Sequence, residues 1–131
     1  MGRPPEEGPR GIDGVTAFLG LRWVSPEEVL LTVRPELINR AGLLSGVVSF
    51  ALVDYSMGSA LWVQTTEEES IATINISINY VQTATAGDVR CRSQVDRRNR
   101  RGAVLRSEVS AEDGRLLATA VGSYAIFPRR A

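Results

Sequence analysis

Residues 41–66 read AGLLSGVVSFALVDYSMGSALWVQTT, and Asp54 is the only charged residue in this stretch. At the helical period, Asp54 falls on one stripe with six apolar or small residues, namely Val47, Phe50, Ala51, Met57, Gly58 and Leu61. Removing an ionised carboxylate from water is costly unless other groups pair with it. Asp54 is therefore expected either to have a structural role with dedicated hydrogen bonds or to take part in chemistry.

The same stretch predicts one long helix that begins after Ser45 and ends near Val63. Serine is favoured immediately before the first turn of a helix, so Ser45 is expected to be the N-cap. The stretch is long enough to span a membrane, but Asp54, four serines and three glycines favour a buried core helix. Because the helix is apolar on nearly every side, the side with Asp54 is expected to pack against another subunit.

Strands are predicted on both sides of this helix. Before it, the pattern indicates a short helix and two hairpin strands, over residues 12–19, 21–24 and 29–33. After it, alternation of apolar and polar residues predicts four more strands, over residues 71–81, 88–97, 103–111 and 116–127. This order of elements predicts an α+β fold, in which an antiparallel sheet wraps around one long central helix.

The first strand after the helix has the clearest alternation. One face is expected to carry Ile74, Ile76, Ile78 and Tyr80, and the other face Thr73, Asn75, Ser77 and Asn79.

The 131 residues suffice for one domain with its own core. Residues 1–11 are polar and rich in proline and glycine, so they are expected to be a flexible tail before a single domain over residues 12–131. The net charge is zero, and neither nucleic acid nor a membrane is expected as a partner. The first twenty residues carry no signal-peptide pattern, so a cytoplasmic protein is expected.

Two missing residue types restrict the chemistry. The chain has no histidine, and all fifteen of its basic residues are arginine. This composition excludes Ser–His and Cys–His catalysis, histidine-ligated metals, a Schiff-base lysine and the lysine of a phosphate-binding loop. The single cysteine, Cys91, is expected to be a small buried hydrophobe, and no metal site is expected. A general base must then be Asp or Glu, with Tyr a poor third choice.

The residues around the start of the helix resemble the signature of the hot-dog-fold acyl-CoA thioesterases, in particular the phenylacetate-pathway and 4-hydroxybenzoyl-CoA type group. That signature reads N-x-x-G-x-x-H-G-G, followed by an apolar helix with an acidic residue seven positions after the last glycine. The corresponding positions here are Asn39, Gly42, Ser45, Gly46, Val47 and Asp54. The match is in register without a gap, and it departs from the signature where Ser45 replaces histidine and Val47 replaces the last glycine.

Two later segments add to the resemblance. TINISINY at residues 73–80 is similar to a family strand that begins with a hydroxyl residue and ends in tyrosine. DGRLLATAVGSY at residues 113–124 is similar to the family's closing strand, D-G-x-x-x-A-x-G-x-Y. The resemblance covers about residues 12–127 and implies the hot-dog fold.

The resemblance also implies hydrolysis of an acyl-CoA thioester, with CoA as part of the substrate and no separate cofactor. Asp54 would act as nucleophile or as general base for a water, Asn39 would orient that water or the substrate carbonyl, and Thr73 would position the water. The backbone N–H of Gly46 or Val47 would polarise the thioester oxygen, with help from the helix N-terminus.

The spacing of these residues requires a homodimer for this mechanism. Asp54 lies nine residues after Ser45, which is about 13 Å along a helix. A carboxylate cannot reach a carbonyl held at the start of its own helix, but it can reach the start of an antiparallel second helix. Each site would then combine Asn39 and Gly46 of one subunit with Asp54 and Thr73 of the other, and the resemblance further implies a homotetramer.

Other residues are expected to contact the substrate. Ser45 and Val47 lie at the helix start, where Ser45 is expected to cap the helix rather than to act as a nucleophile, because no histidine or lysine can activate it. Four arginines flank Asn99 in a predicted turn, namely Arg97, Arg98, Arg100 and Arg101. They are expected either to bind the phosphates of CoA or to form a solvated turn.

A second hypothesis is a non-catalytic acyl-CoA-binding protein of the same fold, because the histidine and the last glycine of the signature are replaced. A hydratase of this fold would normally rely on a histidine, which the chain lacks.

Overall fold

The computed structural model describes residues 13–130, so the tail expected at residues 1–11 lies outside the described residues. The described part contains these elements in chain order: α1 (Gly14–Leu19), β1 (Arg22–Ser25), β2 (Glu28–Thr32), the 3-10 turn η1 (Pro35–Leu37), α2 (Gly46–Trp62), β3 (Glu69–Tyr80), β4 (Asp88–Arg98), β5 (Gly102–Ala111) and β6 (Leu116–Pro128). None of the described helices is long and apolar enough to cross a membrane.

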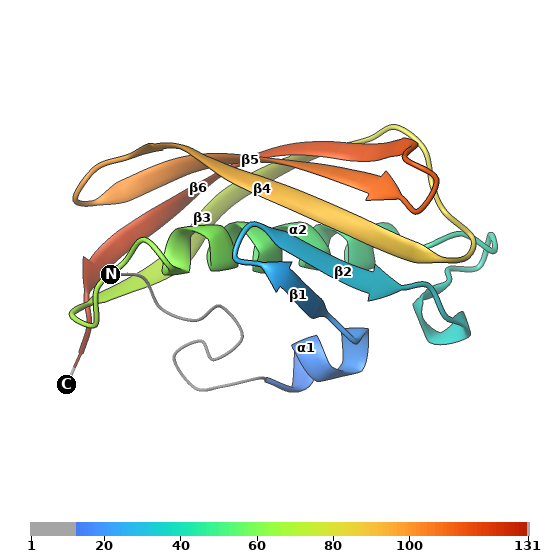
Figure 1. Cartoon of the computed structure of the whole chain (residues 1–131), viewed down its shortest axis with the longest axis horizontal. Coiled ribbons are helices and arrows are strands. Elements are labelled where there is room, and N and C mark those ends of the chain that lie inside the picture. The colour runs from blue at the N-terminus through green and yellow to red at the C-terminus, as the bar shows by residue number, and fades with distance from the viewer. Residues whose placement is uncertain (1–12, 131) are drawn as a thin grey trace.

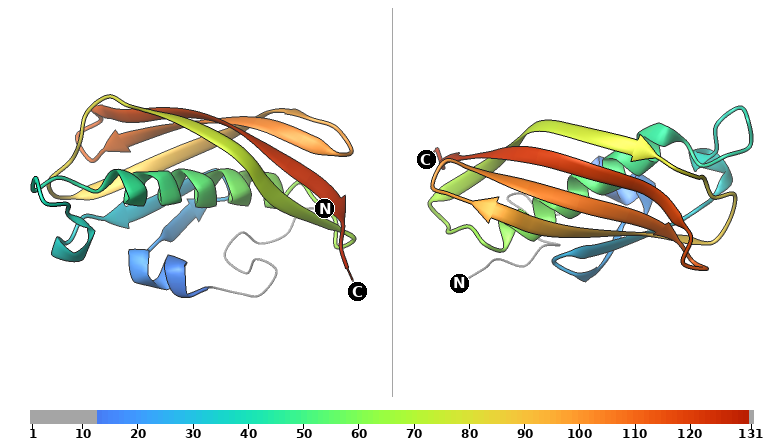
Figure 2. Two further views of the ribbon diagram at one scale, coloured as in Figure 1. Left: turned by 180° about the vertical axis from the view of Figure 1, so that it is seen from behind. Right: turned by 90° about the horizontal axis from the view of Figure 1, so that it is seen from above.

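The six strands form one antiparallel sheet in the order β1-β2-β4-β5-β6-β3. The sheet curves around α2, which lies along its concave side (Figures 1 and 2). The predicted α+β fold, with a sheet wrapped around one long helix, is confirmed. The two sheet edges are β1, which has 4 residues, and β3, which has 12.

The helix α2 is buried against the sheet over more of its circumference than the sequence indicates. Met57 and Leu61, placed with Asp54 on one stripe above, have no exposed surface. Val47, in contrast, is 78% exposed, and Phe50 is 37% exposed. The curved sheet covers more than one side of the helix, so the part left uncovered is a narrow strip along Val47, Phe50 and Asp54.

An extra residue in β3 changes which side chains face the helix. Thr73 pairs with Tyr124 and Asn75 pairs with Ser123, so Ile74 has no partner of its own in β6. This is a β-bulge, in which two residues of one strand lie opposite one residue of the next. The expectation that Ile74 shares a face with Ile76 is therefore wrong, and Ile74 is 65% exposed.

The same bulge corrects the expected position of Thr73. Opposite residues in an antiparallel pair project to the same face, and Tyr124, which lies opposite Thr73, is buried beneath α2. Thr73 therefore points toward the helix and not toward the face that carries Asn75. Strict alternation across residue 74 assigns Thr73 to the wrong face of the sheet, because the sequence pattern does not reveal the bulge.

A glycine in β6 lets the helix approach the sheet closely at this level. A Cβ atom on Gly122 would lie 2.7 Å from the sulfur of Met57 and 3.2 Å from Cγ1 of Ile76. Gly122 is two residues before Tyr124 on the same face, so this close contact also fixes the distance between α2 and the strand that carries Tyr124.

Candidate active site

The carboxylate of Asp54 is held by two hydroxyl groups from neighbouring strands. Thr73 Oγ1 of β3 donates to Asp54 Oδ1 at 2.8 Å, and the hydroxyl of Tyr124 in β6 donates to the same oxygen at 2.5 Å. The Tyr124 hydroxyl also lies 2.9 Å from the backbone oxygen of Asp54. Within residues 13–130, no hydrogen bond or ion pair is found at Oδ2. Asp54 itself is half-buried.

Tyr124 was quoted in the sequence motif without a role, and the structure gives it one. Its side chain is 2% exposed. Burial, and then the negative charge of Asp54, raise the pKa of Tyr124 well above the usual range, so its hydroxyl keeps its proton and remains a donor. The alternation in β6, where Tyr124 lies two residues after Gly122, predicts that the Tyr124 side chain is buried. It does not predict the hydrogen bond to Asp54, because that bond depends on the pairing of β6 with the bulged strand β3.

The start of α2 offers one free backbone donor. Ser45 is the N-cap, as predicted, and its Oγ accepts from the N–H of Val47 at 3.3 Å. The N–H of Gly46 has no partner among residues 13–130. Of the two donors expected to polarise the thioester oxygen, the one on Gly46 is therefore available, and the one on Val47 is already engaged.

A second tyrosine, also given no role in the sequence analysis, fixes the first turn of α2. The hydroxyl of Tyr80 donates to the carbonyl oxygen of Gly46 at 2.6 Å. A Cβ atom on Gly46 would lie 3.3 Å from Cζ of the Tyr80 ring, which is tighter than most real contacts. Only glycine fits here without moving the ring, and the peptide that follows Gly46 is held in one orientation.

Asn39 orders the loop that leads into α2. Its Oδ1 accepts from the N–H of Ala41 at 2.9 Å and from the N–H of Leu43 at 3.2 Å. The side chain is exposed, and its amide nitrogen has no partner in the described part of the chain. Asn39, Gly46 and Tyr80 line a cleft of about 320 Å³ beside the helix start.

One chain brings the predicted site residues together in two groups rather than one. Asp54 and Thr73 are in contact near the middle of α2, while Asn39, Ser45 and Gly46 lie around its first turn. Gly46 and Asp54 are eight residues apart on the same helix, which is about 12 Å at 1.5 Å per residue. The two groups therefore cannot act on one carbonyl within a single chain.

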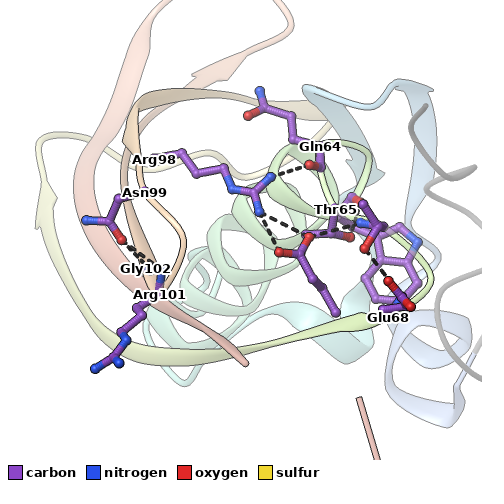
Figure 3. A network of polar contacts seen from close by, with 10 residues as sticks. Gln64, Thr65, Glu68, Arg98, Asn99, Arg101 and Gly102 are labelled. Carbon is purple, nitrogen blue, oxygen red and sulfur yellow. Dashed lines mark hydrogen bonds and ion pairs between the residues drawn. The ribbon is translucent and has the colours of Figure 1, made fainter. Parts of the chain in front are cut away.

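The arginine turn, which is the set of four arginines around Asn99, is only partly a turn. Arg97 and Arg98 are the last residues of β4, and Arg100 and Arg101 lie between β4 and β5. One of the four side chains is engaged and three are exposed. Arg98 donates to both carboxylate oxygens of Glu69, at 2.8 and 3.0 Å, and to the backbone oxygen of Gln64. Figure 3 shows this network and, beside it, the Arg101 side chain pointing away from it. The exposed side chains are those of Arg97, Arg100 and Arg101.

The exposed arginines adjoin a cavity. Arg100 and Arg101 line a space of about 730 Å³ together with Glu68, Phe127 and Pro128. An anionic group could be held there by the two guanidinium groups, while Arg98 serves to tie the loop after α2 to β4.

Cys91 takes no part in the site. It is fully buried, and this burial raises the pKa of its thiol. Among residues 13–130, no three or more His, Cys, Asp or Glu side chains are grouped so that they could hold a metal ion.

Comparison with known proteins gives a consistent pattern. The sequence model of the thioesterase superfamily matches residues 41–118, which include the helix α2 and the strands β3 to β5. None of the curated proteins matches the chain. Among solved structures, the conserved protein PA5202 from Pseudomonas aeruginosa is 30% identical, with a TM-score of 0.82 over 88% of this chain and 95% of that one.

Two further structures bear on the fold. A phenylacetic acid degradation-related protein from Ralstonia eutropha is 25% identical, with a TM-score of 0.79 over 90% of this chain and 93% of that one. The BH2602 protein from Bacillus halodurans, solved with CoA, is 20% identical, with a TM-score of 0.85 over 90% of this chain and 78% of that one. At this last identity the similarity shows the fold alone.

Proposed function

The chain belongs to the thioesterase superfamily, and from this premise we propose that it hydrolyses an acyl-CoA thioester to a free acid and CoA. The observation that carries the proposal is the state of Asp54. One carboxylate oxygen is held by Thr73 and Tyr124, and the other has no hydrogen bond or ion pair within residues 13–130. A buried structural aspartate would have both oxygens paired, whereas a reacting one needs a free oxygen.

Two routes are compatible with this arrangement. In the first, Asp54 attacks the thioester carbon, a C–O bond forms, the C–S bond breaks, and the CoA thiolate leaves. Water then hydrolyses the resulting anhydride. In the second, Asp54 takes a proton from a water whose oxygen attacks the carbonyl, and the departing thiolate receives that proton. Neither route requires histidine or lysine.

The backbone N–H of Gly46 would stabilise the oxygen on which negative charge develops. It lies in the first turn of α2, where the helix dipole also favours negative charge. A donor fixed in advance at such a position contributes strongly to catalysis, because it need not reorganise during the reaction. The contact between Tyr80 and the Gly46 carbonyl supports this role, since it keeps the first turn in place.

A homodimer would bring the two groups of residues together. Two copies related by a two-fold axis, with their α2 helices antiparallel, would place Gly46 and Asn39 of one copy beside Asp54 of the other. The long edge strand β3 supports this assembly, because its outer edge is unpaired within the described chain and could pair with the same strand of a second copy. Exposed Val47 and Phe50 would then be covered. Two such dimers would make the homotetramer that the sequence resemblance implies.

The arginine turn would bind the phosphates of CoA. Arg97, Arg100 and Arg101 remain for this role, because Arg98 is engaged with Glu69 and Gln64. Arginine suits such a contact because its planar guanidinium donates two parallel hydrogen bonds to a phosphate.

A thiol-release assay over short, medium, long and aryl acyl-CoAs tests the function. Asp54→Asn should lower kcat for the best substrate by at least about a hundredfold. The oligomeric state measured by size-exclusion chromatography should be unchanged. Asp113→Asn is the matched control, because Asp113 is exposed and, within residues 13–130, its side chain bonds only to Arg115. Full activity of Asp54→Asn would contradict the proposal.

One observation favours the alternative, a non-catalytic acyl-CoA-binding protein. Ser45 occupies the N–H of Val47, so the helix start offers one donor fewer to a thioester oxygen. Calorimetric binding of an acyl-CoA together with no thiol release from any of the panel would support this alternative.

A further inference from the structure

We infer that Tyr124 is a positioning residue, which together with Thr73 fixes Asp54 Oδ1 and thereby makes Oδ2 the oxygen that reacts. The inference deepens the proposed function and rests on it, because it concerns the same carboxylate.

The two donors reach one oxygen because of how β3 and β6 pair. Thr73 and Tyr124 are directly opposite each other, so both side chains leave the sheet on the face toward α2. Their hydroxyl oxygens lie 2.8 and 2.5 Å from Oδ1. Two donors from two strands define the plane of the carboxylate, which a single hydrogen bond would leave free to rotate.

The two hydrogen bonds to Asp54 Oδ1 determine the role of Oδ2. A carboxylate oxygen accepts about two hydrogen bonds, and Oδ1 already has two strong donors. Oδ2 has no partner among residues 13–130. The lone pair that attacks a carbonyl, or that takes a proton from water, must be free before the reaction. Oδ2 is therefore the atom that meets the substrate.

Within residues 13–130, Asp54 has no cationic partner that could replace these donors. Across the described residues no arginine forms an ion pair with it. The titratable groups that face it are Tyr124 from β6 and Tyr55 on α2, and Tyr55 in turn donates to the carboxylate of Asp13, at 3.0 and 3.2 Å. Tyr124 is the more buried of the two phenols and the only one bonded to Asp54, so removing its hydroxyl removes the stronger of two neutral donors.

The test compares Tyr124→Phe with Tyr55→Phe, since each variant loses one phenol-to-carboxylate hydrogen bond and keeps the ring. Tyr124→Phe should lower kcat by about tenfold or more while KM changes less than about twofold, the size expected for one hydrogen bond to a charged group. Tyr55→Phe should keep both the kcat and the KM of the wild type.

A second variant keeps the inference testable if Tyr124→Phe does not fold. Thr73→Val removes the other donor to Asp54 Oδ1, and it should likewise lower kcat while KM changes less than about twofold.

The outcomes separate this inference from the proposed function. A Tyr124→Phe variant with the kcat and KM of the wild type overturns the inference, and leaves the function standing if Asp54→Asn is inactive. Full activity of Asp54→Asn overturns both.

Discussion

Tyr80 and Gly46 meet at the first turn of α2, where the phenol hydroxyl donates to the glycine carbonyl at 2.6 Å and the ring leaves no room for a Cβ atom. One residue comes from the end of β3 and the other from the helix start, so the contact fixes the helix terminus relative to the sheet. The backbone N–H proposed to polarise the thioester belongs to this same glycine.

Gly46→Ala should therefore impair turnover more than stability. The new methyl group would lie 3.3 Å from Cζ of Tyr80 and would push the ring or the helix start by a few tenths of an ångström. We expect kcat/KM to fall by about tenfold, since a 1 Å displacement of a catalytic group can cost ~100-fold. The free energy of unfolding should change by less than about 1 kcal/mol, because alanine favours the helix. Equal kcat/KM in Gly46→Ala and wild type would exclude Gly46 as the donor.

Mixing two inactive variants should restore activity if each site is shared between subunits. Asp54→Asn keeps Asn39, and Asn39→Ala keeps Asp54, so a mixed dimer has one intact site and one doubly defective site. After denaturation and joint refolding of equal amounts, about half of the dimers are mixed, and about a quarter of wild-type activity should return. Refolding each variant alone is the control. No recovery in the mixture, with dimers present by analytical ultracentrifugation, would show that the site lies within one chain.

Arg100→Ala combined with Arg101→Ala should weaken binding of CoA substrates specifically. Both side chains line the cavity near Phe127, and we expect KM for an acyl-CoA to rise by about tenfold as two charged contacts are lost. KM for the corresponding acyl-pantetheine, which lacks phosphates, should not change. Arg106→Ala is the matched control, because Arg106 is exposed and pairs with Asp96 at 3.1 Å on the sheet. Equal effects on both substrates would argue against phosphate recognition.

Alkaline pH should destabilise the protein through its tyrosines and its buried thiol. Burial raises the pKa of all three tyrosines and of Cys91, and the pKa of Tyr55, which is also bonded to Asp13, reaches about 12. For the tyrosines, a raised pKa in the folded state means that the stabilisation is complete below pH about 10, the value in the unfolded chain, and is lost as pH rises toward 12. The chain has no lysine to titrate in this range. Urea unfolding between pH 8 and 11.5 measures the decline.

The Tyr55→Phe variant identifies the source of that decline. Its free energy of unfolding should fall less steeply above pH 10 than that of the wild type, because one of the shifted phenols is gone. Identical slopes for the two proteins would mean that Tyr55 does not contribute.

Much of the fold could be predicted from the sequence, because local signals determine it. Ser45 caps α2 as its type and position indicate, and the glycines between the strands mark turns that the structure contains. The resemblance to the thioesterase signature also implied Asn39, Gly46 and Asp54 as site residues, and that assignment stays a prediction. Such features depend on a residue and its neighbours along the chain.

What could not be predicted depends on pairing between distant segments. The sequence does not show that Tyr124 lies opposite Thr73, since that follows from the pairing of β3 with β6. The sequence also does not show that Arg98 forms an ion pair with Glu69. The two residues are 29 positions apart, and they meet only because the end of α2 lies beside β4. The arginine turn therefore looked uniform in the sequence, although one of its four side chains has a structural partner.

The bulge in β3 also bears on how this chain should be aligned with its relatives. Without residue 74, the strand would alternate perfectly, with Ile71, Thr73, Ile76, Ile78 and Tyr80 all on the side of the helix. Ile74 thus behaves as an extra residue in the middle of the strand, and the pairing register with β6 shifts by one residue across it. Insertions are usually tolerated in loops, whereas Ile74 lies inside a paired strand. A sequence alignment that placed this extra residue in the nearest loop would pair Thr73 with the wrong residue of a homologue. For a homologue one residue shorter, the gap belongs inside the strand.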